Sequence, residues 1–105
     1  MKILTPGHKY ELENFEQNCS ELNQHLQFIH KEPQEFGSIE LKTVNDGTTN
    51  EEVLKVLIDI LQFLQSKFPC RENAIVITKL EEALMWLEKR TYDRVMRGVE
   101  GKQLS

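Results

Sequence analysis

The sequence has few features of a secreted, membrane-spanning or metal-binding protein. Only 2 of its 105 residues are cysteine, and Cys19 and Cys70 are far apart and form no CxxC pair. We therefore expect reduced, unpaired thiols, buried as small apolar side chains, and no metal or cofactor. No apolar run approaches the ~20 residues of a membrane span, and the N-terminus lacks the apolar segment of a signal peptide. These absences predict a cytoplasmic protein that does not bind membranes.

A broad basic surface is also missing. The formal net charge is -4, and residues 1–60 hold 5 basic and 11 acidic side chains, a net charge of -6. Residues 61–105 hold 8 basic and 6 acidic side chains, a net charge of +2. This balance argues against DNA or other non-specific nucleic-acid binding, which requires an extended cationic face. It is compatible with a small anionic ligand held by a few arginines.

Catalytic patterns are not found either. His8, His25 and His30 have no metal-ligand spacing, and His25 and His30 are predicted to lie on opposite faces of one strand. Glu81 and Glu82 are adjacent in a predicted helix, so their carboxylates point apart and form no acid–base pair. We therefore expect a binding protein and not an enzyme.

The sequence predicts one α+β domain, residues 1–105, that begins with a small antiparallel β-sheet over 1–46. Apolar and polar residues alternate around Tyr10–Leu12, Leu26–Phe28 and Ile39–Leu41. Alternation with a period of two is typical of strands with one buried face. Three short strands are the simplest interpretation.

A long antiparallel α-helical hairpin is predicted over 49–98, followed by a C-terminal tail, 99–105. The first helix should end near Lys67, because Pro69 disfavours helical geometry in the residue before it. Pro69 also suits the first position of the second helix. Gly98 suits the left-handed position that follows a helix end.

Each predicted helix has an apolar face at steps of three and four residues. On the first helix this face comprises Val53, Leu57, Ile60, Leu61 and Leu64, and on the second it comprises Leu80, Leu84 and Leu87. Further apolar residues widen both faces beyond what one small sheet can cover. A homodimer is therefore expected.

Three arginines follow the apolar face of the second helix. Arg90, Arg94 and Arg97 recur at the same helical steps, so their side chains project from one side. Guanidinium groups bind phosphates in bidentate fashion, and two of them one turn apart suit a diphosphate. The alternative is that these cations only favour the negative end of the helix dipole.

Several stretches of the sequence carry a family resemblance. They are KYELENFE (9–16), LQFI (26–29), GTTNEEVL (47–54), FPCREN (68–73), ITKLEEAL-W-L (77–87) and RT-DR--RGVEG (90–101). With these stretches the chain resembles the Thoeris anti-defence protein one family of bacteriophages. Its hairpin is also similar to that of the anti-CBASS protein two family.

The resemblance implies a sponge that acts in the cytoplasm of the infected bacterial host. Members bind glycocyclic ADP-ribose made by the TIR enzyme of the Thoeris system and hold it without cleaving it, so the effector NADase stays inactive. They are homodimers or trimers of dimers. Binding of cyclic oligonucleotides at separate sites also occurs in the group.

Matched residue by residue, the resemblance implies a ligand site made of Phe63, Asn73, Arg90 and Arg94. Phe63 would stack on adenine, Asn73 would hydrogen-bond an adenine edge or a ribose hydroxyl, and the arginines would hold the pyrophosphate. Asn73 and Arg90 are about 25 Å apart along one helix. One nucleotide-sized ligand therefore requires residues from two subunits.

Two other functions remain open at the level of sequence. The chain could be a sponge for the cyclic oligonucleotides of CBASS. It could also be a protein-interaction module that binds no small ligand.

Overall fold

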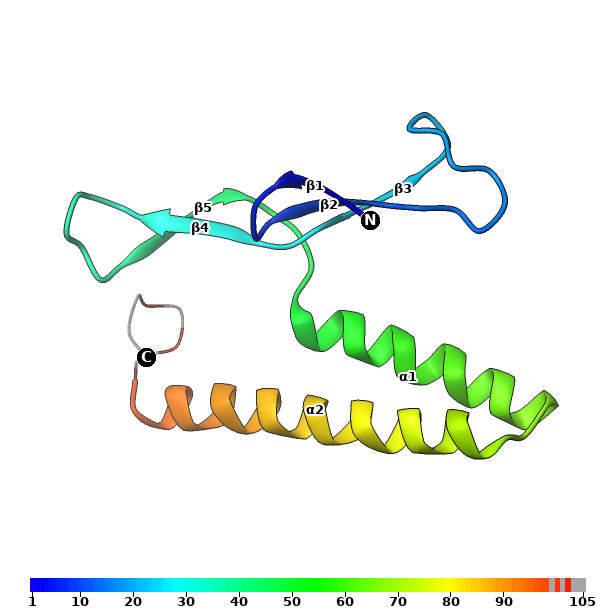
Figure 1. Cartoon of the computed structure of the whole chain (residues 1–105). Coiled ribbons are helices and arrows are strands. Elements are labelled where there is room, and N and C mark those ends of the chain that lie inside the picture. Colours follow the sequence, from blue (N-terminus) through cyan, green and yellow to red (C-terminus); the bar gives the residue numbers. More distant parts are fainter. Residues whose placement is uncertain (99, 101, 103–105) are drawn as a thin grey trace. The chain divides into compact units, whose positions relative to one another are not determined.

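The computed structural model describes residues 1–98, 100 and 102. The chain divides into two compact units, Met1–Thr49 and a second unit from Asn50 onward. The first unit contains five antiparallel strands in two small sheets, and the second contains a hairpin of two helices (Figure 1). The predicted α+β class, with its N-terminal sheet structure and helical hairpin, is confirmed.

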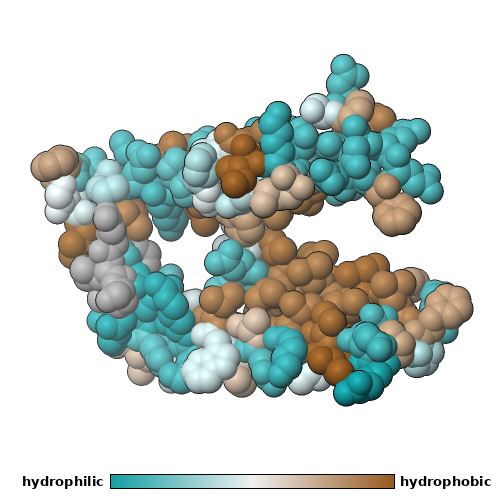
Figure 2. Space-filling view, in the orientation of Figure 1, coloured by the Kyte–Doolittle hydropathy of each residue, from teal (hydrophilic) through white to brown (hydrophobic). Residues whose placement is uncertain are grey.

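Little of the described chain is fully shielded from solvent. Within residues 1–98, 100 and 102, no hydrophobic residue is buried, and Arg94, 5% exposed, is the one buried polar residue. Large hydrophobic side chains instead form a broad patch on the hairpin, which Figure 2 shows over α1 (Asn50–Lys67). Each unit therefore covers its apolar residues only in part.

The first sheet has the strand order β1-β2-β3, with β1 Lys2–Thr5, β2 Lys9–Leu12 and β3 Gln24–Gln27. Tyr10 lies opposite Leu26 in the β2–β3 register. The Tyr10 ring also meets Phe28 edge to face, at 6.0 Å between centroids. Such aromatic contacts stabilise pairs of strands beyond the area that they bury.

The second sheet pairs β4 (His30–Pro33) with β5 (Leu41–Asn45). Three strands were predicted, and β1 and β4 were missed. Adjacent Ile3 and Leu4 break the alternation in β1, and β4 consists of polar residues ending in a proline that cannot donate a ladder hydrogen bond. Neither strand therefore has the usual sequence pattern.

The prediction that His25 and His30 occupy opposite faces of one strand is wrong, because they belong to different sheets. His25 lies in β3, with its Nε2 3.7 Å from a Glu11 carboxylate oxygen. His30 lies in β4 and stacks on His8 with 3.7 Å between ring centroids. The strand break at residues 28–29 separates the two positions.

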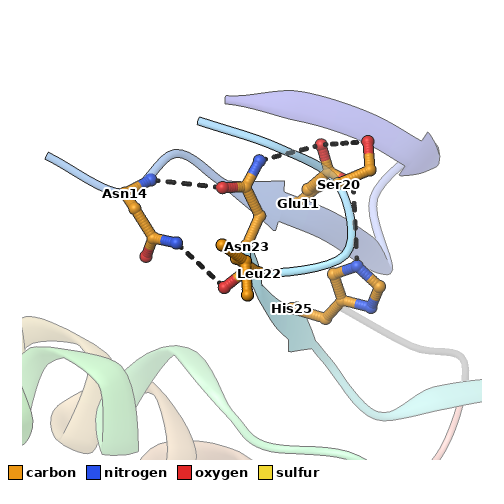
Figure 3. A network of polar contacts seen from close by, with 6 residues as sticks. All are labelled: Glu11, Asn14, Ser20, Leu22, Asn23 and His25. Carbon is orange, nitrogen blue, oxygen red and sulfur yellow. Dashed lines mark hydrogen bonds and ion pairs between the residues drawn. The ribbon is translucent and has the colours of Figure 1, made fainter. Parts of the chain in front are cut away.

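Side-chain amides organise the long loop between β2 and β3 (Figure 3). Asn14 Nδ2 donates to the Leu22 carbonyl oxygen at 2.8 Å, and Asn23 Oδ1 accepts from the Asn14 backbone N–H at 3.4 Å. Asn23 Nδ2 and Ser20 Oγ both donate to Glu11 Oε2, at 3.3 and 3.5 Å. These polar contacts fasten the loop to β2.

Backbone pairing joins the end of the first unit to its strands. The Thr48 N–H donates to the Gln27 carbonyl at 2.8 Å, and the Thr48 carbonyl accepts from the Ile29 N–H at 2.9 Å. Gly47 precedes this pairing, and a Cβ there would lie 2.6 Å from the Gln27 carbonyl oxygen and 2.7 Å from the Phe28 carbonyl carbon. Only glycine permits so close an approach of two backbones.

Replacing Gly47 with alanine is therefore expected to lower the free energy of unfolding by about 1–3 kcal/mol, the usual cost of forcing extra atoms into a packed position. Chemical denaturation monitored by circular dichroism measures the change. Glu35→Ala, at an exposed position between β4 and β5, is the control and should cost less than about 0.5 kcal/mol. Equal stabilities of the two variants would contradict the close backbone approach.

The hairpin consists of α1 and α2 (Arg71–Met96), which pack along each other. α1 ends at Lys67, as predicted. The Gln65 side chain closes the connection, because its Nε2 donates to the Cys70 carbonyl at 2.9 Å and its Oε1 accepts from the Cys70 N–H at 3.0 Å. These two bonds fix the short turn between the helices.

The predicted helical position of Pro69 is wrong, because α2 begins at Arg71. Cys70 intervenes with extended backbone, φ -149° and ψ 157°, and its Sγ accepts from the Asn73 N–H at 3.4 Å. The predicted burial of the cysteines is wrong as well, because Cys70 and Cys19 are both exposed and unpaired. Cys70 serves as the N-cap, and Cys19 lies in the loop between β2 and β3.

The C-terminal end of α2, at Met96, lies close to residue 98, where the hairpin was predicted to end. Arg97 follows the last helical residue, and Gly98 has a φ of 74° while its N–H donates to the Val95 carbonyl at 3.0 Å. With 18 residues in α1 and 26 in α2, the second helix is longer by about 12 Å. The last turns of α2 therefore extend beyond α1. Of the predicted tail, 99–105, only Glu100 and Lys102 lie within the described residues.

The face of α1 that packs on α2 differs from the predicted one. The half-buried apolar residues of α1 are Val53, Leu54, Ile58 and Leu61, whereas Leu57, Ile60 and Leu64 are 41–45% exposed. On α2 the predicted Leu80, Leu84 and Leu87 are half-buried, together with Ile77. The hairpin thus uses one apolar stripe of α1 and leaves a second one at the surface.

Candidate functional site

The three predicted arginines come together at the C-terminal end of α2. A surface hollow of about 480 Å³ there is lined by Arg90, Asp93, Arg94, Met96 and Arg97. Asp93 forms an ion pair with Lys89, one turn earlier, at 2.8 Å. The helical steps predicted from the sequence therefore produce a cationic hollow, which we call the arginine end of the hairpin.

Arg90 and Arg94 have different surroundings, although the sequence presents them as equivalent. Arg90 is exposed. Arg94 is 5% exposed, its Nε donates to Glu100 Oε2 at 3.2 Å, and its Nη2 donates to the Lys102 carbonyl oxygen at 2.8 Å. This end of α2 extends beyond α1, so α1 does not cover it. Part of its cover comes from residues that follow the helix.

Phe63 and Asn73 lie near the opposite end of the hairpin, beside the turn that joins the helices. Phe63 is 55% exposed, and the Lys67 ammonium lies 5.1 Å from its ring centroid, within the range of a cation–π contact. Asn73 is half-buried in the first turn of α2, where its backbone N–H donates to the Cys70 cap. We call this region the turn end.

One chain does not bring the four predicted residues together. Phe63 and Asn73 belong to the turn end, and Arg90 and Arg94 to the arginine end. The seventeen-residue spacing of Asn73 and Arg90 falls within a single continuous helix, so about 25 Å separates them along its axis. The four predicted residues are therefore divided between the two ends of the hairpin, and we call each pair a half-site of the predicted ligand site.

Two residues beside these half-sites were missed in the sequence. Lys67 could have been recognised, because it follows Phe63 by four residues and such pairs are neighbours on a helix. Glu100 lies beyond the helix end, where no periodicity relates it to Arg94. In the sequence, Glu100 is singled out only as part of the RGVEG stretch that carries the family resemblance.

The exposed apolar patch lies on α1, where it runs from Val56 toward the turn end. Its members are Val56, Leu57, Ile60, Phe63 and Leu64, of which Val56, at 61%, and Phe63 exceed half exposure. An exposed patch of large apolar side chains along one helix is typical of a protein–protein interface.

No group of three or more His, Cys, Asp or Glu side chains within residues 1–98, 100 and 102 is arranged to hold a metal ion. Within the same residues, neither helix combines the length and the apolar character that crossing a membrane requires.

Residues 26–92 match the family described as "Acb2/Tad1, hairpin domain". The chain is also similar to the protein named "Thoeris anti-defense 1" of Bacillus phage SBSphiJ7, with 60% identity over 57 residues. That match covers 53% of this chain and 40% of the length of the relative. The family match includes Phe63, Asn73 and Arg90 and ends two residues before Arg94.

Proposed function

Because this chain belongs to the Acb2/Tad1 hairpin-domain family, we propose that it is a phage anti-defence protein acting on the Thoeris system. It binds glycocyclic ADP-ribose in the cytoplasm of the infected host and sequesters it without cleaving it. The effector NADase then receives no signal. A sponge needs slow ligand release and stoichiometric amounts of protein, and it needs no catalytic group.

The observation that carries this proposal is the arginine end. Three arginines line one hollow of about 480 Å³, a volume typical of small-molecule sites. Phosphates are the anions that guanidinium groups bind with the best geometry, and charge-assisted bonds of this kind are about twice as strong as neutral ones. Arg90 and Arg94, one turn apart, match the two linked phosphates of an ADP-ribose.

The turn end supplies the complementary chemistry. The exposed Phe63 ring offers a stacking surface for a purine, and the nearby Asn73 amide has both donors and an acceptor. The two half-sites together would bind the base and the pyrophosphate of one ligand.

Two subunits are needed to complete such a site. An antiparallel pair of hairpins places the arginine end of one subunit beside the turn end of the other and gives two equivalent pockets. The apolar patch on α1 supports this arrangement, because its burial would stabilise the pair by about 25 cal/mol per Å². The assembly is a homodimer or a trimer of dimers.

Calorimetric titration of the purified protein with glycocyclic ADP-ribose tests the function. We expect tight binding near one ligand per chain, with intact ligand recovered by chromatography after heat denaturation. Recovery of a hydrolysed product would instead establish an enzyme. Binding of cyclic oligonucleotides alone would establish a CBASS sponge, and failure to bind either class would favour a protein-interaction module.

A further inference from the structure

Arg94 has its own anionic partner within the chain. Its side chain is 6% exposed and its Nε lies 3.2 Å from Glu100 Oε2, while the Glu100 side chain is 44% exposed. The Arg94 Nη2 donates to the Lys102 backbone carbonyl. A guanidinium that lines an anion-binding hollow is thus engaged by a carboxylate before any ligand arrives.

We propose that Glu100 is an internal competitor for the anionic ligand at Arg94. The inference rests on the proposed function, in that the arginine end binds a diphosphate. A phosphate oxygen takes the place of Glu100 Oε2 at the Arg94 Nε, and the released carboxylate turns to solvent. The bond between Arg94 Nη2 and the Lys102 carbonyl persists in both states and keeps the guanidinium positioned.

Because Glu100 is partly exposed, its exchange for a phosphate costs little free energy. An ion pair with one partner 44% exposed is partly screened by water, and pairs of this kind contribute at most about 1 kcal/mol. The freed carboxylate recovers its hydration. Arg94, in contrast, is buried, and a buried guanidinium is stabilised by an adjacent anion, so a phosphate takes over the role of the carboxylate.

Arg90 explains how a diphosphate gains access to Arg94. Arg90 is exposed and about 6 Å along the helix from Arg94, so it binds a first phosphate without displacing anything. The second phosphate is then held next to Arg94 at a high effective concentration. Glu100 also has a high effective concentration at Arg94, because it belongs to the same chain. A ligand that Arg90 already holds reaches a comparable effective concentration and can therefore displace Glu100.

The competitor is expected to weaken ligand binding in a measurable way. Glu100→Gln removes the charge with little change in shape, and we expect it to strengthen the binding of inorganic pyrophosphate about 3- to 5-fold, measured by calorimetry. Glu82→Gln is the matched control, because Glu82 is exposed on the same helix and does not line the hollow. It removes an equal charge about 18 Å along α2 from Arg94, beyond a Debye length of about 10 Å, and should change the affinity less than about 2-fold.

A double-variant comparison shows whether Glu100 acts through Arg94. In an Arg94→Gln background, Glu100→Gln should strengthen pyrophosphate binding no more than Glu82→Gln does. Glu100→Asp keeps the charge on a shorter side chain and should give an intermediate affinity, which provides a second test if Glu100→Gln folds poorly. Thermal melting followed by circular dichroism verifies the fold of each variant.

The possible failures are distinguishable. Pyrophosphate binding by the natural protein, with Glu100→Gln binding no more tightly than Glu82→Gln, would overturn the competition and leave the proposed function intact. Failure of the natural protein and of Glu100→Gln to bind both pyrophosphate and glycocyclic ADP-ribose would overturn the arginine end as a ligand site, and the competition with it.

Discussion

Replacing Arg90 and Arg94 with glutamate together is expected to weaken glycocyclic ADP-ribose binding by about a thousandfold or more. Each arginine contributes a charge-assisted contact of about 1.5–3 kcal/mol, and each glutamate adds repulsion of the pyrophosphate. Competition binding against a labelled ligand measures the loss. Arg90→Glu alone should produce a large part of it and does not disturb the pair between Arg94 and Glu100.

The control for this experiment is Lys55→Glu combined with Lys79→Glu. Both lysines are exposed on the hairpin and neither lines the hollow at the arginine end, and the double change alters the net charge by the same amount. We expect this variant to retain affinity within about threefold, because exposed charges that make no direct contact with a ligand contribute little in the presence of salt. Equal losses in both double variants would indicate a general charge effect and contradict the arginine clamp.

Replacing Ile60 with aspartate is expected to separate the subunits and, with them, the two half-sites. Ile60 is 45% exposed in the single chain, so a carboxylate there costs little within one hairpin. In an interface the same carboxylate would be desolvated without a partner, at a cost of several kcal/mol. Sedimentation velocity should show a monomer, and ligand binding should be lost together with the dimer.

Gln62→Asp provides the matched control, because Gln62 is exposed on the polar side of α1 and the introduced side chain is the same. It should leave both the sedimentation coefficient and the affinity unchanged. A natural protein that sediments as a monomer at all concentrations, yet binds one ligand per chain, would contradict the two-subunit site.

The hairpin could be predicted because local signals are strong there. Regular apolar spacing, Pro69 after the first helix and Gly98 after the second all act on neighbouring residues, and the helix ends at Lys67 and Met96 agree closely with them. Which face of α1 meets α2 could not be predicted. Apolar residues occupy two sides of α1, and periodicity alone does not show which side packs within the chain.

From the sequence, the candidate site could be predicted only for those residues that lie on the same helix. The spacing of Arg90, Arg94 and Arg97 predicted the hollow that they line. The difference between Arg90 and Arg94 depends on Glu100 and Lys102, which follow the helix end and reach Arg94 through a change of chain direction at Gly98. No helical spacing relates residues across such a turn, so their role required the structure.

The separation of the half-sites along α2 also restricts how proteins of this kind can change in length. A single inserted residue in α2 would rotate Arg90 by about 100° around the helix axis relative to Asn73. Seven residues make nearly two full turns and leave the angle between the two side chains almost unchanged. In an antiparallel pair, a seven-residue insertion in each helix lengthens both subunits alike, so each arginine end still meets the turn end of its partner. We therefore expect the two helices of related hairpins to differ in length from this one by multiples of seven residues, with the same change in α1 and α2.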